Sequence, residues 1–80
     1  MMNNFEENIE LRVFLLAIYK RESDESFKDV IAKMEDARVF DQKTGKKYLK
    51  ELRQLGFISE DSLTMIGIEQ AKNVEMEFKI

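Results

Sequence analysis

The chain has 80 residues, which is enough for one domain with a single small core. It contains neither cysteine nor histidine, so disulfides, thiolate metal sites and the most common general base are all excluded. Its three glycines are too far apart for a phosphate-binding loop, and its carboxylates lack the spacing of a metal-binding loop. We therefore expect one domain over residues 1–80 that is not an enzyme and uses no metal, cofactor or small-molecule ligand.

The longest apolar run, residues 13–19, is shorter than the roughly 20 residues that a membrane-spanning helix needs. Acidic residues precede this run, whereas a secretion signal has a basic flank. These two features predict a cytoplasmic protein that does not enter a membrane.

The first predicted helix runs from about Phe5 to Lys20, and Asn4 can cap it with Glu7 in a capping box. One apolar stripe is expected on this helix, and further apolar residues widen it to most of the circumference. The stripe consists of Ile9, Val13, Leu16 and Ala17, and the widening residues are Phe14, Leu15 and Ile18. The extra apolar side is covered either by a partner or by the chain's own C-terminus.

A second helix is predicted from Ser26, which forms a capping box with Asp29, to about Asp36 or Ala37. It carries apolar residues at the spacing of a buried helical stripe. These residues are Phe27, Val30, Ile31 and Met34. We expect this stripe to be part of the core.

A third helix is predicted over residues 42–55, with Asp41 as its N-cap and Gly56 as its C-terminal stop. At about 100° per residue, its basic and its apolar side chains fall on opposite faces. The basic residues are Lys43, Lys46, Lys47, Lys50 and Arg53, and the apolar ones are Tyr48, Leu49, Leu52 and Leu55. This pattern predicts one buried face and one positively charged face.

Charge is distributed unevenly along the chain, whose net charge is −3. Residues 1–42 carry a net charge of −4, residues 43–56 carry +4, and residues 57–80 carry −3. A basic segment on an acidic body attracts an anionic partner to that segment and repels it elsewhere. The partner is either a nucleic acid or an acidic protein patch, including one on a second copy of the chain.

After the third helix, residues 57–59 and 63–65 are predicted to form a small β-hairpin. Thr64 is a candidate N-cap for a short helix over residues 65–73. Residues 63–73 are either helix or extended strand. Residues 74–80 alternate strictly between apolar and charged side chains, which predicts a half-buried strand. That strand pairs either with the hairpin or with its own copy in a second chain.

This order of elements resembles the winged helix-turn-helix domain of bacterial transcriptional regulators. The resemblance lies in residues 40–58, where a cap and a polar run precede Tyr-Leu-x-x-Leu-x-x-Leu-Gly-Phe-Ile, and in the later Leu63-Thr64-x-x-Gly67. It implies a mainly helical α+β fold with a three-helix core, a short β-hairpin wing and a C-terminal strand.

The resemblance also implies a function. In such domains the third helix enters the major groove of double-stranded DNA, and the protein is commonly a dimeric transcriptional regulator. The expected dimer surfaces are the first helix and the C-terminal strand. The expected DNA-facing residues are Gln42, Lys43, Thr44, Lys46 and Lys47, with Lys50 and Arg53 reaching the phosphate backbone.

Three features depart from the usual pattern of these domains. The connection over residues 35–40 is long, the wing carries Glu60 and Asp61 without any basic residue, and Gly45 lies inside the recognition helix. Because winged helices also serve as docking modules, the alternative is a protein–protein interaction module that does not bind DNA.

Overall fold

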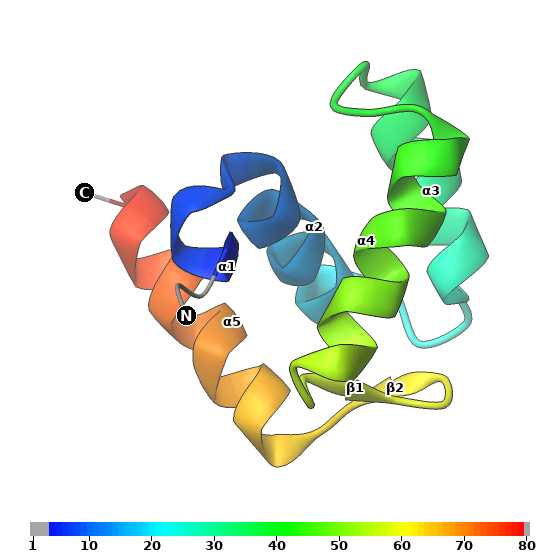
Figure 1. Ribbon diagram of the computed structural model, residues 1–80. Coiled ribbons are helices and arrows are strands. Elements are labelled where there is room, and N and C mark those ends of the chain that lie inside the picture. The colour runs from blue at the N-terminus through cyan, green and yellow to red at the C-terminus, as the bar shows by residue number, and fades with distance from the viewer. Residues whose placement is uncertain (1–3, 80) are drawn as a thin grey trace.

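The computed structural model describes residues 4–79 and is mainly helical, with one small antiparallel sheet, in agreement with the predicted α+β class (Figure 1). Its elements are α1 Asn4–Glu7, α2 Ile9–Lys20, α3 Phe27–Asp36, α4 Gln42–Gln54, β1 Ile58–Ser59, β2 Ser62–Leu63 and α5 Met65–Lys79. Helix α2 lies between α5 on one side and α3 and α4 on the other.

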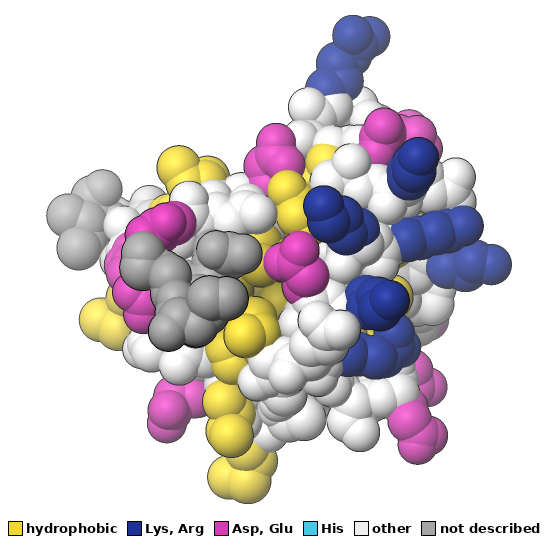
Figure 2. Space-filling model, viewed as in Figure 1, with side chains coloured by type: hydrophobic (Ala, Val, Ile, Leu, Met, Phe, Trp, Pro, Cys, Tyr) yellow, Lys and Arg dark blue, Asp and Glu magenta, His cyan; other side chains and the backbone are white. Residues whose placement is uncertain are grey.

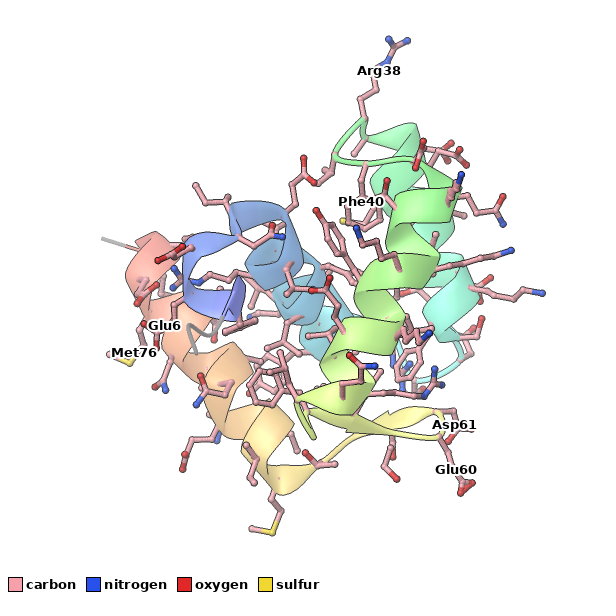
Figure 3. The ribbon with its side chains drawn as sticks, viewed as in Figure 1. Glu6, Arg38, Phe40, Glu60, Asp61 and Met76 are labelled. Carbon is pink, nitrogen blue, oxygen red and sulfur yellow. The ribbon has the colours of Figure 1, made fainter. Side chains whose placement is uncertain are left out.

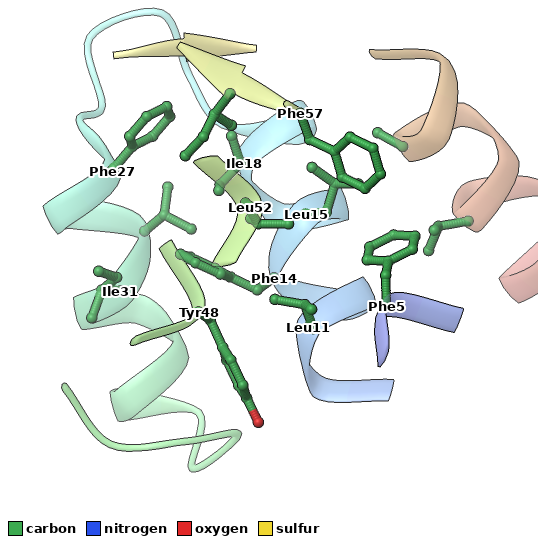
Figure 4. Packing of buried hydrophobic residues seen from close by; sticks show 14 of the residues in the cluster. Phe5, Leu11, Phe14, Leu15, Ile18, Phe27, Ile31, Tyr48, Leu52 and Phe57 are labelled. Carbon is green, nitrogen blue, oxygen red and sulfur yellow. The ribbon is translucent and has the colours of Figure 1, made fainter. Parts of the chain in front are cut away.

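The predicted first helix is divided in two at Asn8. The backbone of Asn8 is extended, and its side-chain oxygen accepts a hydrogen bond of 3.0 Å from the backbone N–H of Leu11. Asn8 therefore caps α2, whereas Asn4, the predicted cap, lies within α1. The break turns Phe5 into the core, where its ring meets the edge of Phe57 at 5.1 Å (Figure 4).

The predicted apolar stripe of the first helix is wrong by about one position. The buried residues of α2 are Leu11, Phe14, Leu15 and Ile18, whereas Ile9 is 68% exposed. Val13, Leu16 and Ala17 are only half-buried. Helices α1, α3, α4 and α5 all pack against α2, so most of its wide apolar circumference is covered within the chain. The C-terminal segment, α5, is one of these covering elements, as the second of the two alternatives predicted. The apolar surface that α2 still exposes is Ile9 and parts of Val13, Leu16 and Ala17, and pairing through this helix stays a prediction.

The predicted starts of α3 and α4 are confirmed. The Ser26 side chain accepts from the backbone N–H of Asp29, and Asp29 accepts from that of Ser26, which completes the capping box. Asp41 caps α4 by accepting from the backbone N–H of Thr44 at 2.8 Å. Such caps satisfy backbone donors that the helix itself leaves free.

Helix α4 lies close against α3 because Gly45 faces it. A Cβ atom at Gly45 would lie 2.7 Å from Cγ2 of Ile31 and 2.9 Å from Cε1 of Phe40. Phe40 in turn stacks edge-on against Phe14 and Tyr48, with ring centroids 5.3 and 5.4 Å apart. The glycine inside α4 is therefore a packing requirement, and these aromatic contacts join α4 to the core.

The C-terminal segment is a helix, so the predicted strand over residues 74–80 is wrong within the described residues; Ile80 lies outside them. Residues 63–73, which were open between helix and strand, divide at Thr64, because Leu63 ends β2 and the residues from Met65 are helical. Gly67, Ala71 and Val74 form the buried face of α5. The alternating carboxylates do not mark a sheet edge. Glu75 forms an ion pair with Lys20, and Glu77 forms one with Arg12.

The helix is favoured because the only sheet among residues 4–79 has strands of two residues each and offers no partner for a longer strand. A helix satisfies its own backbone groups, whereas an unpaired strand does not. The loss of this strand also removes the second expected dimer surface.

A tight joint connects α4 to α5 through the β1–β2 hairpin. Gly56 has a φ of +81°, which glycine adopts without strain and which ends α4 as predicted. The Thr64 hydroxyl donates to the carbonyl of Gly56 at 2.6 Å and accepts from the N–H of Gly67 at 3.0 Å, so Thr64 caps α5. A Cβ at Gly67 would lie 1.8 Å from the carbonyl oxygen of Phe57, so only glycine fits there.

Candidate nucleic-acid interface

The outer face of α4 is basic and exposed, as predicted. Figure 2 shows lysine and arginine side chains gathered on the side of the molecule formed by α3 and α4. The exposed predicted site residues are Gln42, Lys43, Lys46, Lys47, Lys50 and Arg53. Tyr48 and Leu52 are buried on the opposite face, but Leu55, which was expected beside them, is 37% exposed. Leu55 follows the last helical residue and has left the buried face.

Thr44 is the one predicted site residue that is only half-exposed. The Asp41 carboxylate accepts a hydrogen bond from the backbone N–H of Thr44 and another from the Thr44 side chain. These two bonds, the backbone one first, hold the pKa of Asp41 below its ordinary value. Thr44 is therefore engaged in starting the helix, which limits its freedom to contact a partner.

Arg53 contacts the hairpin as well as solvent. Its guanidinium donates to the carbonyl of Glu60 at 2.7 Å, and Arg21, from the end of α2, donates to the carbonyl of Asp61 at 2.8 Å. Arg21 also lies over the Phe27 ring at 4.5 Å. The two arginines thus hold the hairpin turn by its backbone, and the Glu60 and Asp61 side chains project outward (Figure 3).

A second acidic border lies along the other flank of α4. A hollow between the start of α2 and α4 is lined by Glu7, Asn8, Ile9, Glu10, Lys47, Tyr48 and Glu51. The Tyr48 hydroxyl donates to Oε1 of Glu10 at 2.7 Å, and burial together with this carboxylate raises the pKa of Tyr48. Lys47 therefore marks the boundary between the basic face and this acidic hollow.

Arg38 is a basic residue that the sequence reasoning did not include in the site. It lies in the connection between α3 and α4, has a φ of +62° and points away from the body of the molecule (Figure 3). Left-handed backbone at a non-glycine residue is uncommon and arises here at the turn after α3. Its position, before the start of α4, extends the basic surface at that end; the sequence signal was a lone arginine just ahead of the Asp41 cap.

Comparison with protein family models, with curated proteins and with solved structures finds no match to this chain. Between residues 4 and 79, no helix is long and apolar enough to cross a bilayer. The same residues contain no group of three or more carboxylates arranged to hold a metal ion.

Proposed function

We propose that the chain is a winged-helix DNA-binding regulator in which α4 is the recognition helix and the β1–β2 hairpin is the wing. The observation that carries this proposal is the placement of five cationic side chains, all exposed, on the face of α4 opposite the core. These residues are Lys43, Lys46, Lys47, Lys50 and Arg53.

The dimensions of α4 suit a major groove. Its 13 residues give a rod about 20 Å long, and a major groove about 12 Å wide admits a helix. The N-terminal half would meet base edges, where Gln42 pairs with adenine and Lys43 or Lys47 with guanine. Lysines further along the helix would contact phosphates as point charges.

The acidic borders restrict this interface to α4 and the connection before it. Glu60 and Asp61 at the hairpin turn repel phosphates, and so do Glu7 and Glu10 beside the other flank. A wing of this kind does not insert into the minor groove. Affinity would therefore come from few contacts and depend strongly on salt.

A titration of mixed-sequence duplex DNA across a salt series tests the proposal. If five cations neutralise phosphates, log K falls with log salt at a slope of roughly −4.5, which is a loss of about 500-fold between about 50 and about 200 mM salt. Absence of binding at low salt would overturn the proposal.

The double variant Lys46→Glu/Lys47→Glu should lose binding without unfolding, because both side chains are exposed. The matched comparison is Lys47→Glu against Lys79→Glu, which change the charge equally on α4 and at the end of α5. Only the first should weaken binding. Equal binding by the double variant and the parent would exclude α4 as the contact.

The alternative, a docking module for an acidic protein, is favoured by the carboxylates that border the basic face on two sides. Such borders fit a short acidic helix better than a long uniform polyanion. This alternative predicts recovery of a stoichiometric protein partner without nucleic acid, and loss of that partner in the Lys46→Glu/Lys47→Glu variant.

A further inference from the structure

The solvent face of α5 carries an ordered set of four exposed residues. Met65, Glu69, Lys72 and Met76 follow one another at spacings of four, three and four residues, so they lie on one side of the helix. Met65 is 87% exposed and Met76 is 68% exposed, so both side chains are open to a partner. The opposite face, with Gly67, Ala71 and Val74, packs against the core.

The order of these residues is self-complementary. When α5 is placed antiparallel to an identical helix, with a twofold axis midway between Gln70 and Ala71, Met65 meets the partner's Met76 and Glu69 meets the partner's Lys72. The symmetry repeats both contacts, so the seam has two apolar layers outside and two oppositely charged layers inside. Spacings of four and three are also those of the seam residues in a coiled coil.

We infer that α5 is an interaction surface for a second copy of this chain, which pairs with it antiparallel through Met65, Glu69, Lys72 and Met76. A second copy fits because each of these four residues finds its complement among the same four residues of an identical helix. A parallel arrangement would place Glu69 against the partner's Glu69 and Lys72 against the partner's Lys72, which repel. The charged layers therefore fix both direction and register.

This surface is independent of the proposed DNA contact. Helix α2 separates α5 from α4, so pairing through α5 leaves the basic face of α4 open (Figure 1). One helix pair buries less than the roughly 1,600 Å² of a standard interface. The dimer is accordingly expected to be weak and to form only at high protein concentration.

Sedimentation of the whole chain at concentrations from about 10 µM to about 1 mM measures this pairing directly. The apparent mass should rise toward twice that of the monomer. A mass that stays monomeric at all concentrations would overturn the inference, whatever the DNA titration shows.

Charge exchange tests the assignment of the layers. Glu69→Lys alone and Lys72→Glu alone should each weaken self-association at least fivefold, because each variant puts like charges in both inner layers. A mixture of the two variants should associate as strongly as the parent. The mixture restores no ion pair within either helix, so its recovery reports contacts between chains only.

Lys28→Glu serves as the matched control, since it makes the same change of charge on α3, away from the seam, and should leave association unchanged. Self-association that survives in both single variants would exclude this seam. Circular dichroism of each variant verifies that the fold is retained.

Disulfide trapping tests the direction of pairing, and the chain has no cysteine of its own. Met65→Cys mixed with Met76→Cys should give a cross-linked dimer, whereas either variant alone should give at least fivefold less. Equal linking by Met65→Cys alone would indicate parallel helices and overturn the inference.

Discussion

Helices α4 and α5 each bury one face against the core and present the other to solvent, but their outer faces carry charge differently. The outer face of α4 carries five cations, whereas the outer face of α5 carries one acidic and one basic residue between two methionines. A face of one sign repels its own copy and attracts a polyanion. A face of alternating sign gains nothing from a polyanion but can pair with itself.

The comparison shows that amphipathicity alone does not reveal the partner of a helix. Both helices bury one face against the core, and the difference that matters for a partner lies in the sign and order of their exposed residues. The proposals that α4 meets DNA and that α5 meets a second chain rest on this difference. The difference can be tested by substitutions in the residues that hold α4 or α5 in place and by substitutions of the charges beside α4.

Leu52→Ala should have the largest effect, because it removes the fully buried contact on which the basic face of α4 rests. We expect a loss of about 4 kcal/mol in the free energy of unfolding. Leu55→Ala, on the same helix end but 37% exposed, should lose no more than about 0.5 kcal/mol. Urea denaturation of both variants provides the measurement, and equal losses would contradict the observed helix end.

Gly67→Ala should displace the start of α5, because the added methyl group would meet the carbonyl oxygen of Phe57. The expected loss in the free energy of unfolding is about 3 kcal/mol. Glu69→Ala, nearby on the exposed face of α5, is the control and should be nearly neutral. A stable Gly67→Ala variant would show that the joint is looser than described.

Asp41→Ala should lower the Tm by about 4 °C, because α4 loses its cap. The lowered pKa of Asp41 means that the cap stabilises fully above the ordinary aspartate pKa and is lost as pH falls through the folded-state pKa. Asp41→Asn retains the acceptor without the titration. In acid titrations followed by circular dichroism, the parent should therefore lose its advantage over Asp41→Ala, while Asp41→Asn keeps it.

Glu60→Lys/Asp61→Lys should have the smallest effect, since it changes only the charge beside α4 and the arginines hold the turn by its backbone. Affinity for DNA should rise roughly threefold at low salt. A large fall in affinity would show instead that the acidic turn takes part in recognition.

Local signals in the sequence predicted the parts of the fold that local interactions determine. The caps at Ser26 and Asp41 and the two faces of α4 each depend on residues within a few positions of one another. The basic face of the candidate site was predictable for the same reason. Because the lysines and leucines of α4 lie on opposite faces, the helix can only bury its leucines against the core and expose its lysines to solvent.

The errors arose where distant segments decide between local possibilities. Helix α2 is apolar around most of its circumference, so its orientation depends on Phe5 and α5, which the local pattern does not contain. Residues 74–79 alternate with the period of a strand, and only together with Gly67 and Ala71 does Val74 fall on a helical stripe. In the helix, Glu75 and Glu77 form ion pairs with Lys20 and Arg12. The bond from Arg53 to the hairpin likewise required knowing where the hairpin lies.

The joint between α4 and α5 leaves little freedom in the angle between these helices, because Thr64 bonds to the backbone of both Gly56 and Phe57 and Gly67 packs on the Phe57 carbonyl. In two chains paired through α5, the distance and relative rotation of the two α4 helices would follow from this angle. Such a pair would accept two half-sites at one separation along the duplex. A stiff joint would thereby fix how many base pairs separate the two half-sites, although neither chain contacts the DNA between them.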